Sequence, residues 1–548
     1  MTPILALHHP ARSKQYYAAG YWQAQTLYSL LQRNAQTRGS SNALRDSARR
    51  LSWAELLYHV DELAGQLRNS GLRAGDRVSI WLPNRVESII VALACSRDGY
   101  VCNPSLHQSY TADDVFELLK GTTSRALIAQ RDFGVGAKRN DALAQVSAEV
   151  RSLKCVIELD PIGPDVRFGP APAVGHAAAP PVDDPDKVVL LAFTSGTTGN
   201  PKGVMHSDNT ILANARAMAK EWAHHEEMVL LCLSPLTHAI GTIAMAQSLV
   251  SGFELVLNDV PKGMTIMDWL LQSGATYVMG VPTHAIDLLA EAEKRQVDGL
   301  GSVRIFYMGG AAISHDTTTA LIARGITPQN VYGMTENSAH HYTRPDDTVD
   351  TMVHSCGRDC GCYEVKIWDP ANLDLELATG EIGEIGGRGA CLMLGYFGDQ
   401  AATEDAFNRG GWFMSGDLGR IDERGNLQII GRKKDIIIRG GRNIYPNRIE
   451  DAARSHPAVL KAAAFPVPDN RLGEKVAIAI VTREGKGLIA QDLLVHLDRN
   501  RISRYDMPEY FVLLETLPTT PSGKLFKRGL IEQVRTGALK LEPVRWRG

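Results

Sequence analysis

The sequence predicts an α/β protein with largely buried sheets and a second, smaller domain at its C-terminal end. Two observations predict this class: apolar, β-rich runs alternate with helix-like stretches over most of the chain, and this pattern starts afresh near Arg432. The length of 548 residues agrees, because it is several times what one hydrophobic core usually accommodates.

Short apolar runs mark the predicted strands. They cover residues 77–82, 125–130, 187–193, 228–233, 253–257, 276–281 and 303–308. Helical patterns lie between them at residues 53–69 and 210–222. The segment 161–186 is rich in Pro, Ala and Gly, and it predicts a loop that ends just before the run 187–193.

The last part of the chain has its own strand and helix pattern, at residues 447–455, 461–465 and 475–481. This is enough for a small separate domain. We therefore predict an N-terminal domain over residues 1–431 and a C-terminal domain over residues 432–548.

Composition and charge exclude several kinds of partner. The chain is 44% hydrophobic and 22% charged, and a formal net charge of −3 gives no electrostatic case for binding nucleic acid or an anionic membrane. No apolar stretch reaches the roughly 18 residues that span a bilayer, and the first residues lack the apolar segment of a secretory signal. We expect a cytoplasmic protein that acts on small molecules, as a monomer or a homodimer.

The eight cysteines are sparse for this length and lack the dense, even spacing of a disulfide framework, so we expect reduced thiols. His354, Cys356, Cys360 and Cys362 could in principle supply four metal ligands. Their spacing does not match a common zinc pattern. The sequence therefore favours ordinary buried or loop thiols, and no structural metal is expected there.

The segment 194–203 (TSGTTGNPKG) follows the apolar run 187–193 and is the most informative part of the sequence. Its small residues let backbone N–H groups approach phosphate oxygens, its hydroxyls add donors, and its lysine adds positive charge. The predicted nucleotide-binding residues are Thr194, Ser195, Gly196, Thr197, Thr198, Gly199 and Lys202. The pattern is neither G-x-x-x-x-G-K-[ST] nor G-x-G-x-x-G, so it predicts a nucleotide site of another kind.

This loop resembles the signature loop of the acyl-adenylate-forming (ANL) superfamily, which includes acyl- and aryl-CoA ligases, stand-alone adenylation enzymes and beetle luciferases. Further matching segments follow in the family's order and cover nearly the whole chain: 332–336 (YGMTE), 415–419 (SGDLG), 431–435 (GRKKD), 439–446 (RGGRNIYP) and 521–524 (PSGK). The resemblance implies the ANL fold, a large domain of stacked sheets and helices with a small mobile α+β C-terminal domain.

The family carries out two reactions, and the resemblance implies ATP, Mg²⁺ and coenzyme A as cofactors. The acid first attacks ATP to form an acyl-adenylate, and a thiol then takes the acyl group. Adenylation brings two anions together, which requires cations. By resemblance, Lys524 bridges the acid and the α-phosphate as the principal catalytic side chain, Thr335 contacts the α-phosphate, and Glu336 holds Mg²⁺.

The resemblance also assigns the nucleoside contacts. Tyr332 is expected to stack on adenine, and Asp417 and Arg432 are expected to hold the ribose hydroxyls. The remaining residues of this predicted nucleotide site are Gly309, Gly310, Ala311, Gly333 and Met334.

The second reaction needs the C-terminal domain to rotate, since a lysine covering the adenylate would obstruct the thiol. By resemblance the hinge is Lys434. In the rotated state Gly440 and Gly441 would approach the pantetheine tunnel, where missing side chains leave room for a thin chain.

The acid pocket is expected to include His238, Ala239, Gly333 and Met334. His238 matches a position near the substrate carboxylate in the family. The segment 235–241 (PLTHAIG) has no carboxylate to pair with an amino acid's ammonium group, and Ala239 stands where dihydroxybenzoate-activating members carry Asn.

The sequence therefore favours an apolar aryl, alicyclic or medium-chain aliphatic acid, and the chain is similar to cyclohexanecarboxylate and medium-chain acyl-CoA ligases and to dihydroxybenzoate-AMP ligases. The alternative acceptor is a carrier protein loaded by a stand-alone adenylating enzyme. A non-catalytic nucleotide-binding module is disfavoured, because Lys524 and Glu336 are both present.

Overall fold

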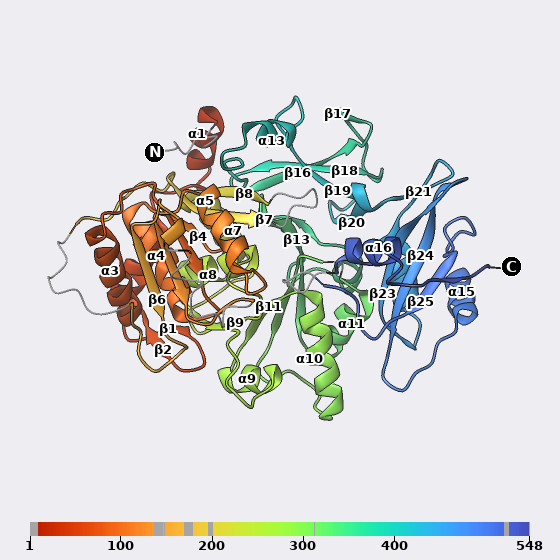
Figure 1. Ribbon diagram of the computed structural model, residues 1–548, viewed down its shortest axis with the longest axis horizontal. Helices are drawn as coiled ribbons and strands as arrows, with labels where there is room; N and C mark the ends of the chain where they lie inside the picture. Colours follow the sequence, from red (N-terminus) through yellow and green to blue (C-terminus); the bar gives the residue numbers. More distant parts are fainter. Residues whose placement is uncertain are drawn as a thin grey trace.

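The computed structural model describes residues 9–135, 146, 148–168, 179–194, 201–311, 313–519 and 525–546. Four β-sheets follow one another across the molecule (Figure 1). Two of them are largely parallel and carry helices on their faces, one is antiparallel, and the fourth belongs to the C-terminal part of the chain. The predicted α/β class is confirmed.

The largest sheet has the strand order β15-β14-β13-β12-β11-β9-β10-β1-β2. Strands β1, β10, β9, β11, β12 and β13 pair in parallel, and antiparallel pairs close both edges. The strands are β1 Asn42–Arg45, β2 Arg50–Ser52, β9 Val229–Cys232, β10 Glu254–Leu257, β11 Tyr277–Gly280, β12 Ile305–Met308, β13 Thr327–Met334, β14 Ser338–Tyr342 and β15 Arg358–Asp359.

A second sheet has the order β6-β5-β3-β4-β7-β8, parallel except for the last pair. Its strands are β3 Arg77–Trp81, β4 Val101–Asn103, β5 Ala126–Gln130, β6 Cys155–Leu159, β7 Val188–Thr194 and β8 Lys202–Ser207. The central strand β3 is buried along its whole length, as the continuous apolar run predicts.

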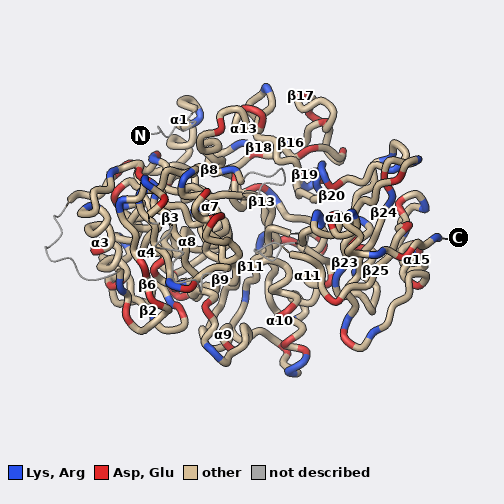
Figure 2. Tube along the Cα trace, in the orientation of Figure 1, with Lys and Arg blue, Asp and Glu red and all other residues tan. Residues whose placement is uncertain are grey.

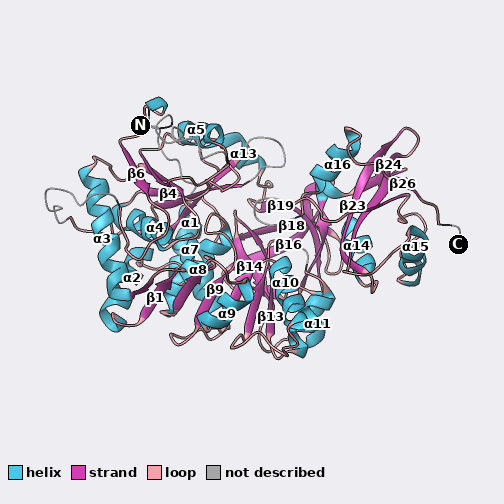
Figure 3. Cartoon of the chain, turned by 60° about the horizontal axis from the view of Figure 1, so that its bottom comes forward, coloured by secondary structure: helices cyan, strands magenta, loops and turns pink. Residues whose placement is uncertain are grey.

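Helices cover these two sheets (Figure 3), and their buried side chains pack in several hydrophobic clusters, the largest of which is a core shared by both sheets. They are α1 Pro10–Ala18, α2 Leu27–Arg38, α3 Trp53–Asn69, α4 Val86–Asp98, α5 Ala112–Gly121, α7 Asp208–Glu221, α8 Ala239–Ser251, α9 Ile266–Ser273, α10 Pro282–Lys294, α11 His315–Ala323 and α12 Val349–His354. Local signals set their ends: Ser52 and Glu55 form a capping box at the start of α3, and Gly99, with φ 72°, ends α4.

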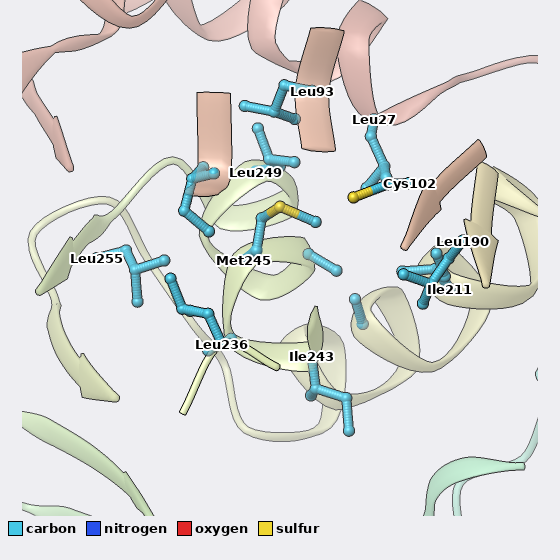
Figure 4. Close-up of a cluster of buried hydrophobic side chains, with 14 of the residues drawn as sticks. Leu27, Leu93, Cys102, Leu190, Ile211, Leu236, Ile243, Met245, Leu249 and Leu255 are labelled. Atoms are coloured by element: carbon cyan, nitrogen blue, oxygen red, sulfur yellow. The ribbon is translucent and has the colours of Figure 1, made fainter. Parts of the chain in front are cut away.

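Helix α8 lies in the centre of this core. Figure 4 shows Met245 of α8 among Leu93 of α4, Leu190 of β7 and Leu255 of β10. All four side chains are buried. Burial on most sides explains why α8 has no charged residue, unlike the amphipathic α3.

The antiparallel sheet has the order β17-β16-β18-β19-β20 and sits above the end of the nine-stranded sheet in Figure 1. Its strands are β16 Tyr363–Asp369, β17 Asn372–Glu376, β18 Gly383–Gly389, β19 Phe413–Ile421 and β20 Leu427–Arg432, with helix α13 Gln400–Asp405 between β18 and β19. Strand β20 ends at Arg432, where the sequence pattern starts afresh.

The C-terminal sheet has its own hydrophobic core of Ile, Val, Ala and Leu side chains. It stands apart at one end of the molecule in Figure 3. Its elements are η1 Lys433–Asp435, β21 Ile437–Arg439, β22 Arg442–Ile444, α14 Pro446–Arg454, β23 Val459–Asp469, β24 Gly473–Thr482, α15 Ala490–Arg499, β25 Tyr510–Leu513, α16 Lys527–Arg535 and β26 Glu542–Pro543.

Charged residues of both signs are interspersed over the chain, without a region of one sign (Figure 2). This agrees with the small net charge of −3. None of the helices in the described ranges combines the length and the apolar character needed to cross a membrane.

A buried cluster of charges joins the connection after β1 to the start of α4. The Glu87 carboxylate accepts hydrogen bonds from Arg49 at 2.5 and 2.8 Å and from Arg85 at 2.7 and 2.9 Å. Arg49 also pairs with Asp46, and the side chains of all four residues are at most 4% exposed. Because the two arginines share Glu87, its loss would leave uncompensated positive charge in the protein interior.

We predict that Glu87→Gln destabilises this part of the protein by about 3 kcal/mol or more. A thermal melt of the full chain measures the effect. The matched control is Glu376→Gln, which breaks the exposed pair with Lys366 (2.8 Å) and should cost under about 1 kcal/mol. Equal melting temperatures for the two variants would contradict the prediction.

Candidate active site

Several of the predicted site residues lie at the carboxyl ends of parallel strands of the nine-stranded sheet. Strand β9 leads into 235–241 and helix α8, β12 leads into 309–311, and β13 carries 332–334. Because neighbouring parallel strands point the same way, the segments that follow them gather at one edge of the sheet, where α/β proteins bind ligands.

The YGMTE segment ends β13 and enters the tight turn that leads to β14. The Met334 N–H donates to Asn337 Oδ1 at 3.0 Å, and Tyr332 pairs with His341 across the hairpin. A Cβ atom on Gly333 would lie 1.7 Å from the Ser338 carbonyl oxygen. Only glycine fits there, which explains the glycine of this motif.

Tyr332, Asp417 and Arg432 form a connected polar group. The Tyr332 hydroxyl donates to Asp417 Oδ2 at 3.0 Å, and Arg432 Nε lies 3.2 Å from Asp417 Oδ1. Burial and the neighbouring Asp417 raise the pKa of Tyr332 well above its ordinary value, so the hydroxyl remains a donor. Antiparallel pairing places Asp417 of β19 directly opposite Arg432 of β20.

Glu336 lies at the end of the same turn. The Tyr396 hydroxyl donates to Glu336 Oε1 at 3.0 Å, and Lys202 Nζ lies 4.7 Å from the centre of the Tyr396 ring. Burial raises the pKa of Glu336, while the Tyr396 hydroxyl and the charge of Lys202 oppose that shift. The carboxylate therefore has a hydrogen-bond donor and a cation close by, as a group that binds a charged ligand needs.

The ends of the phosphate loop are held together by the sheet. Thr194 ends β7, Lys202 begins β8, and the two residues are partners in the antiparallel ladder. The rest of the predicted loop and the catalytic candidate lie outside the described residues. These are Ser195, Gly196, Thr197, Thr198, Gly199 and Lys524.

Glycines 309 and 310 and Ala311 form the turn after β12, and Gly310 has a φ of 81°. The Gly309 N–H donates to the Gly280 carbonyl at 3.3 Å, which ties this turn to the end of β11. The turn is therefore held beside the end of β11, and the strand before it, β12, pairs with β13, which carries Tyr332.

His238 is the residue just before α8, and its ring stacks on that of His107 with 4.8 Å between centroids and 20° between planes. His107 Nδ1 lies 3.0 Å from Thr237 Oγ1. Burial lowers the pKa of His107, which favours a neutral ring. Ala239 follows as the first residue of α8.

An apolar cavity of about 40 Å³ opens next to this histidine pair. Thr237, Leu236, Ile89 and Met245 are among its lining residues. The predicted acid-pocket residues His238, Ala239, Gly333 and Met334 do not line it. The cavity begins at Thr237, the neighbour of His238, and extends toward the core between α4 and α8.

The proposed hinge and the glycine pair lie in the C-terminal part. Lys434 is exposed and belongs to the single turn η1, which follows β20 directly. Gly440 and Gly441 form the two-residue tip of the β21–β22 hairpin, with φ of 58° and 80°. Two positive φ angles are typical of the tight hairpin turn that favours glycine.

Sequence reasoning missed three residues of this site. His107 stacks on His238, Tyr396 binds Glu336, and His206 Nε2 donates to the Thr335 carbonyl at 2.7 Å. Only the position of His206, in the strand directly after the phosphate loop, offered a signal in the sequence.

The sequence of the segment that connects β7 to β8, the Glu336 carboxylate with its donor Tyr396, and the apolar cavity are features of a nucleotide-dependent α/β enzyme. Known proteins agree. The profile of the AMP-binding enzyme family matches residues 31–397, and that of the AMP-binding enzyme C-terminal domain matches residues 448–524.

Curated relatives span nearly the full chain. A medium-chain fatty-acid–CoA ligase of Escherichia coli is 30% identical over 523 residues, covering 94% of this chain and 92% of the relative. A salicyl-AMP ligase / salicyl-S-ArCP synthetase of Mycobacterium tuberculosis is 30% identical over 538 residues, covering 95% and 93%. The crystal structure of ATP-bound MatB from Rhodopseudomonas palustris superimposes with a TM-score of 0.83 at 29% identity, covering 93% and 99%.

The chain belongs to the AMP-binding enzyme family. This confirms the predicted acyl-adenylate-forming superfamily and its fold, and it makes the protein an AMP-forming ligase that uses ATP.

His206 makes folding sensitive to acid. Burial lowers its pKa from 6.5 to about 4, so between these values the unfolded chain holds a proton that the folded chain lacks. Above pH 6.5 both states are neutral and the effect vanishes. Stability therefore falls as pH drops from 6.5 toward 4, by up to about 1.4 kcal/mol per pH unit.

We predict that His206→Gln, which keeps a side-chain N–H for the Thr335 carbonyl, reduces the drop in melting temperature between pH 7 and pH 5. Thermal melts of the two proteins at both values measure it. An unchanged drop in the variant would show that His206 does not carry this pH dependence.

Proposed function

We propose that the protein is an ATP-dependent carboxylic acid–CoA ligase acting on an apolar acid, best a medium-chain aliphatic, alicyclic or unsubstituted aryl acid. The observation that carries this proposal is the apolar cavity lined by Thr237, next to His238, together with the charged groups Lys202, Glu336 and the Asp417–Arg432 pair. The cavity suits an apolar chain, and the charged groups suit a nucleotide.

In the first reaction an oxygen of the acid attacks the α-phosphorus of ATP, an O–P bond forms, and pyrophosphate leaves. Charge accumulates at the phosphate in the transition state, which positioned cations stabilise. Lys524 is the proposed bridge between the acid and the α-phosphate. Lys202 and the loop N–H groups are proposed to hold the polyphosphate, and Thr335 to contact the α-phosphate.

Glu336 fits the role of magnesium ligand. Mg²⁺ in nucleotide sites is commonly held by one or two carboxylates together with phosphate oxygens and water. Tyr396 occupies one side of Oε1, which orients the carboxylate. When bound, the ion would neutralise charge on the phosphates. Asp417 and Arg432 are proposed to bind the ribose, and Tyr332 to stack on adenine between Gly333 and the 309–311 turn.

In the second reaction the thiol sulfur attacks the acyl carbon, a C–S bond forms, the thiol proton is released, and AMP leaves. We propose that residues 432–548 rotate as a unit on residues 1–431, with Lys434 as the hinge. The exposure of η1 and the separate C-terminal core support such a motion. The Gly440–Gly441 tip would then line the path of the pantetheine arm.

The size of the cavity limits the length of the acid that it can hold. A cavity of about 40 Å³ takes about three water-sized groups, so a medium-chain acid would need a side chain to move. Met245 lines this cavity and also a smaller one of about 10 Å³ lined by Leu249. Because methionine is unbranched and flexible, a change in the Met245 side-chain conformation could connect the two cavities.

Coenzyme A is the proposed acceptor, supported by the full-length similarity to a medium-chain fatty-acid–CoA ligase. The second candidate is transfer to a carrier protein, which the printed activity of the salicyl-AMP ligase / salicyl-S-ArCP synthetase favours. The cytoplasm, where ATP and coenzyme A are both available, stays the expected compartment, and a monomer or homodimer the expected state.

ATP-dependent pyrophosphate release tests the function across benzoate, cyclohexanecarboxylate and graded fatty acids, each with and without coenzyme A. We expect multiple turnovers only with coenzyme A, and the fastest rates with medium-length apolar acids. A single burst that coenzyme A does not relieve would favour a carrier protein. No release with any acid would overturn the proposal.

We predict that two variants separate the reactions. Lys524→Ala should lose acyl-adenylate formation and still convert a supplied acyl-adenylate to the thioester. Lys434→Pro should do the reverse, because proline restricts the backbone at the hinge. Rapid-mixing assays of each half-reaction measure this, with Lys540→Ala and Lys434→Ala as controls. Equal loss of both half-reactions in both variants would argue against a rotating domain.

Met245→Ala should shift the preference toward longer acids. Removing the side chain joins the two cavities, and we expect kcat/KM for the longer acids to rise by roughly tenfold relative to the shorter ones. Leu249→Ala is the matched control, because Leu249 lines only the smaller cavity and its loss should leave the preference unchanged. The proposal for this pocket fails if both variants keep the wild-type chain-length profile.

A further inference from the structure

Three cysteines from two strand connections meet behind the YGMTE turn. Cys360 and Cys362 lie between β15 and β16, and Cys391 follows β18. Their exposed fractions are 2%, 3% and 0%. The Cys360 and Cys362 sulfurs are 3.3 Å apart, and all three sulfurs lie within 4.8 Å of one another.

The backbone holds this arrangement in place. The Cys360 N–H donates to the His340 carbonyl at 2.8 Å, and the Ala390 N–H donates to the Cys362 carbonyl at 2.8 Å. Tyr363 and Gly389, which adjoin Cys362 and Ala390, are partners in the β16–β18 ladder. Backbone hydrogen bonds therefore tie the two connections that carry the three thiols to the neighbouring chain.

The four residues that the sequence analysis considered as metal ligands do not come together in the fold. His354 ends α12, is half exposed, and lies 3.6 Å from Asp350. Cys356 packs in the separate apolar cluster that includes Tyr332. Cys360 and Cys362 lie instead beside Cys391. The sequence spacing that disfavoured a metal was that of His354, Cys356, Cys360 and Cys362, which do not form one site.

We propose that Cys360, Cys362 and Cys391 form a three-thiolate site for a thiophilic divalent cation of the Zn²⁺ class. Zinc binds cysteine sulfur at about 2.3 Å, which requires sulfurs about 3.7 to 4.0 Å apart around one ion. The separations of 3.3 Å and at most 4.8 Å bracket that range, so small side-chain rotations suffice.

Ligand chemistry decides the kind of ion. Sulfur ligands select soft or borderline cations over Mg²⁺ and Ca²⁺. Binding exchanges three thiol protons for one ion, and a divalent charge offsets two of the three thiolate charges in a buried place.

An ion at this site would stabilise the segments that pack behind the YGMTE turn. The Cys391 thiol donates to the Asn337 carbonyl at 3.2 Å, and the Asn337 side chain contacts the Tyr363 hydroxyl and the Met334 N–H. A bound ion would join β15, β16 and the segment after β18 directly behind this turn. The inference stands on the cysteine geometry and does not depend on the proposed ligase activity.

Cobalt titration tests the site. The full chain, reduced and treated with a chelator, is titrated with Co²⁺ and then with Zn²⁺ while the absorption spectrum is recorded. We expect a sulfur-to-cobalt charge-transfer band that saturates at about one Co²⁺ per chain and disappears when Zn²⁺ displaces it. Cys391→Ser should weaken Co²⁺ binding by roughly tenfold or more.

Cys232→Ser is the matched control, because Cys232 is also buried but contacts the Ser234 carbonyl instead of other thiols. It should bind Co²⁺ like the wild type. Peptide mass spectrometry of the unmutated chain gives a second measurement, in which Zn²⁺ should slow alkylation of Cys360, Cys362 and Cys391 but not of the partly exposed Cys155.

Two results would overturn the proposal. One is the absence of a charge-transfer band together with unchanged alkylation in Zn²⁺. The other is a Cys360–Cys362 disulfide in the chain as isolated without reductant, which would make the pair a redox site.

Discussion

The shared direction of the parallel strands β9, β11, β12 and β13 is the constraint on which the rest of the molecule depends. In-register backbone hydrogen bonds align these strands, so the segments that follow them emerge at one edge. The residue pairs Tyr332–Asp417 and Glu336–Tyr396 then join that edge to the segments around the antiparallel sheet. A polar site is built without breaking the apolar core beneath it.

The charges of this site are compensated before any ligand arrives. Asp417 is shared between the Tyr332 hydroxyl and Arg432, and Glu336 accepts a hydrogen bond from Tyr396 near Lys202. Buried charges need such partners, because desolvation otherwise drives them toward the neutral form. The same partners hold the side chains in one arrangement, so little reorganisation is needed when a nucleotide binds.

The interior behind the site is divided between apolar and polar or thiol-containing regions. On one side, α8 and α4 enclose an apolar cavity whose shape depends on Met245. On the other, His340, Tyr363 and the three clustered cysteines support the turn after β13. The apolar side suits the selection of a carbon chain, whereas the thiol side offers ligands for an ion and a rigid support for the turn.

The sequence by itself determined the α/β class, the positions of most elements and the family. These rest on short-range signals: periodicity, caps and the contiguous strings at 194–203 and 332–336. Only the tertiary structure decided that His107 stacks on His238, that Tyr396 binds Glu336, and that Cys391 rather than His354 joins Cys360 and Cys362. Such pairs are far apart in sequence, and no local propensity specifies them; they meet because strand order and packing bring their elements together.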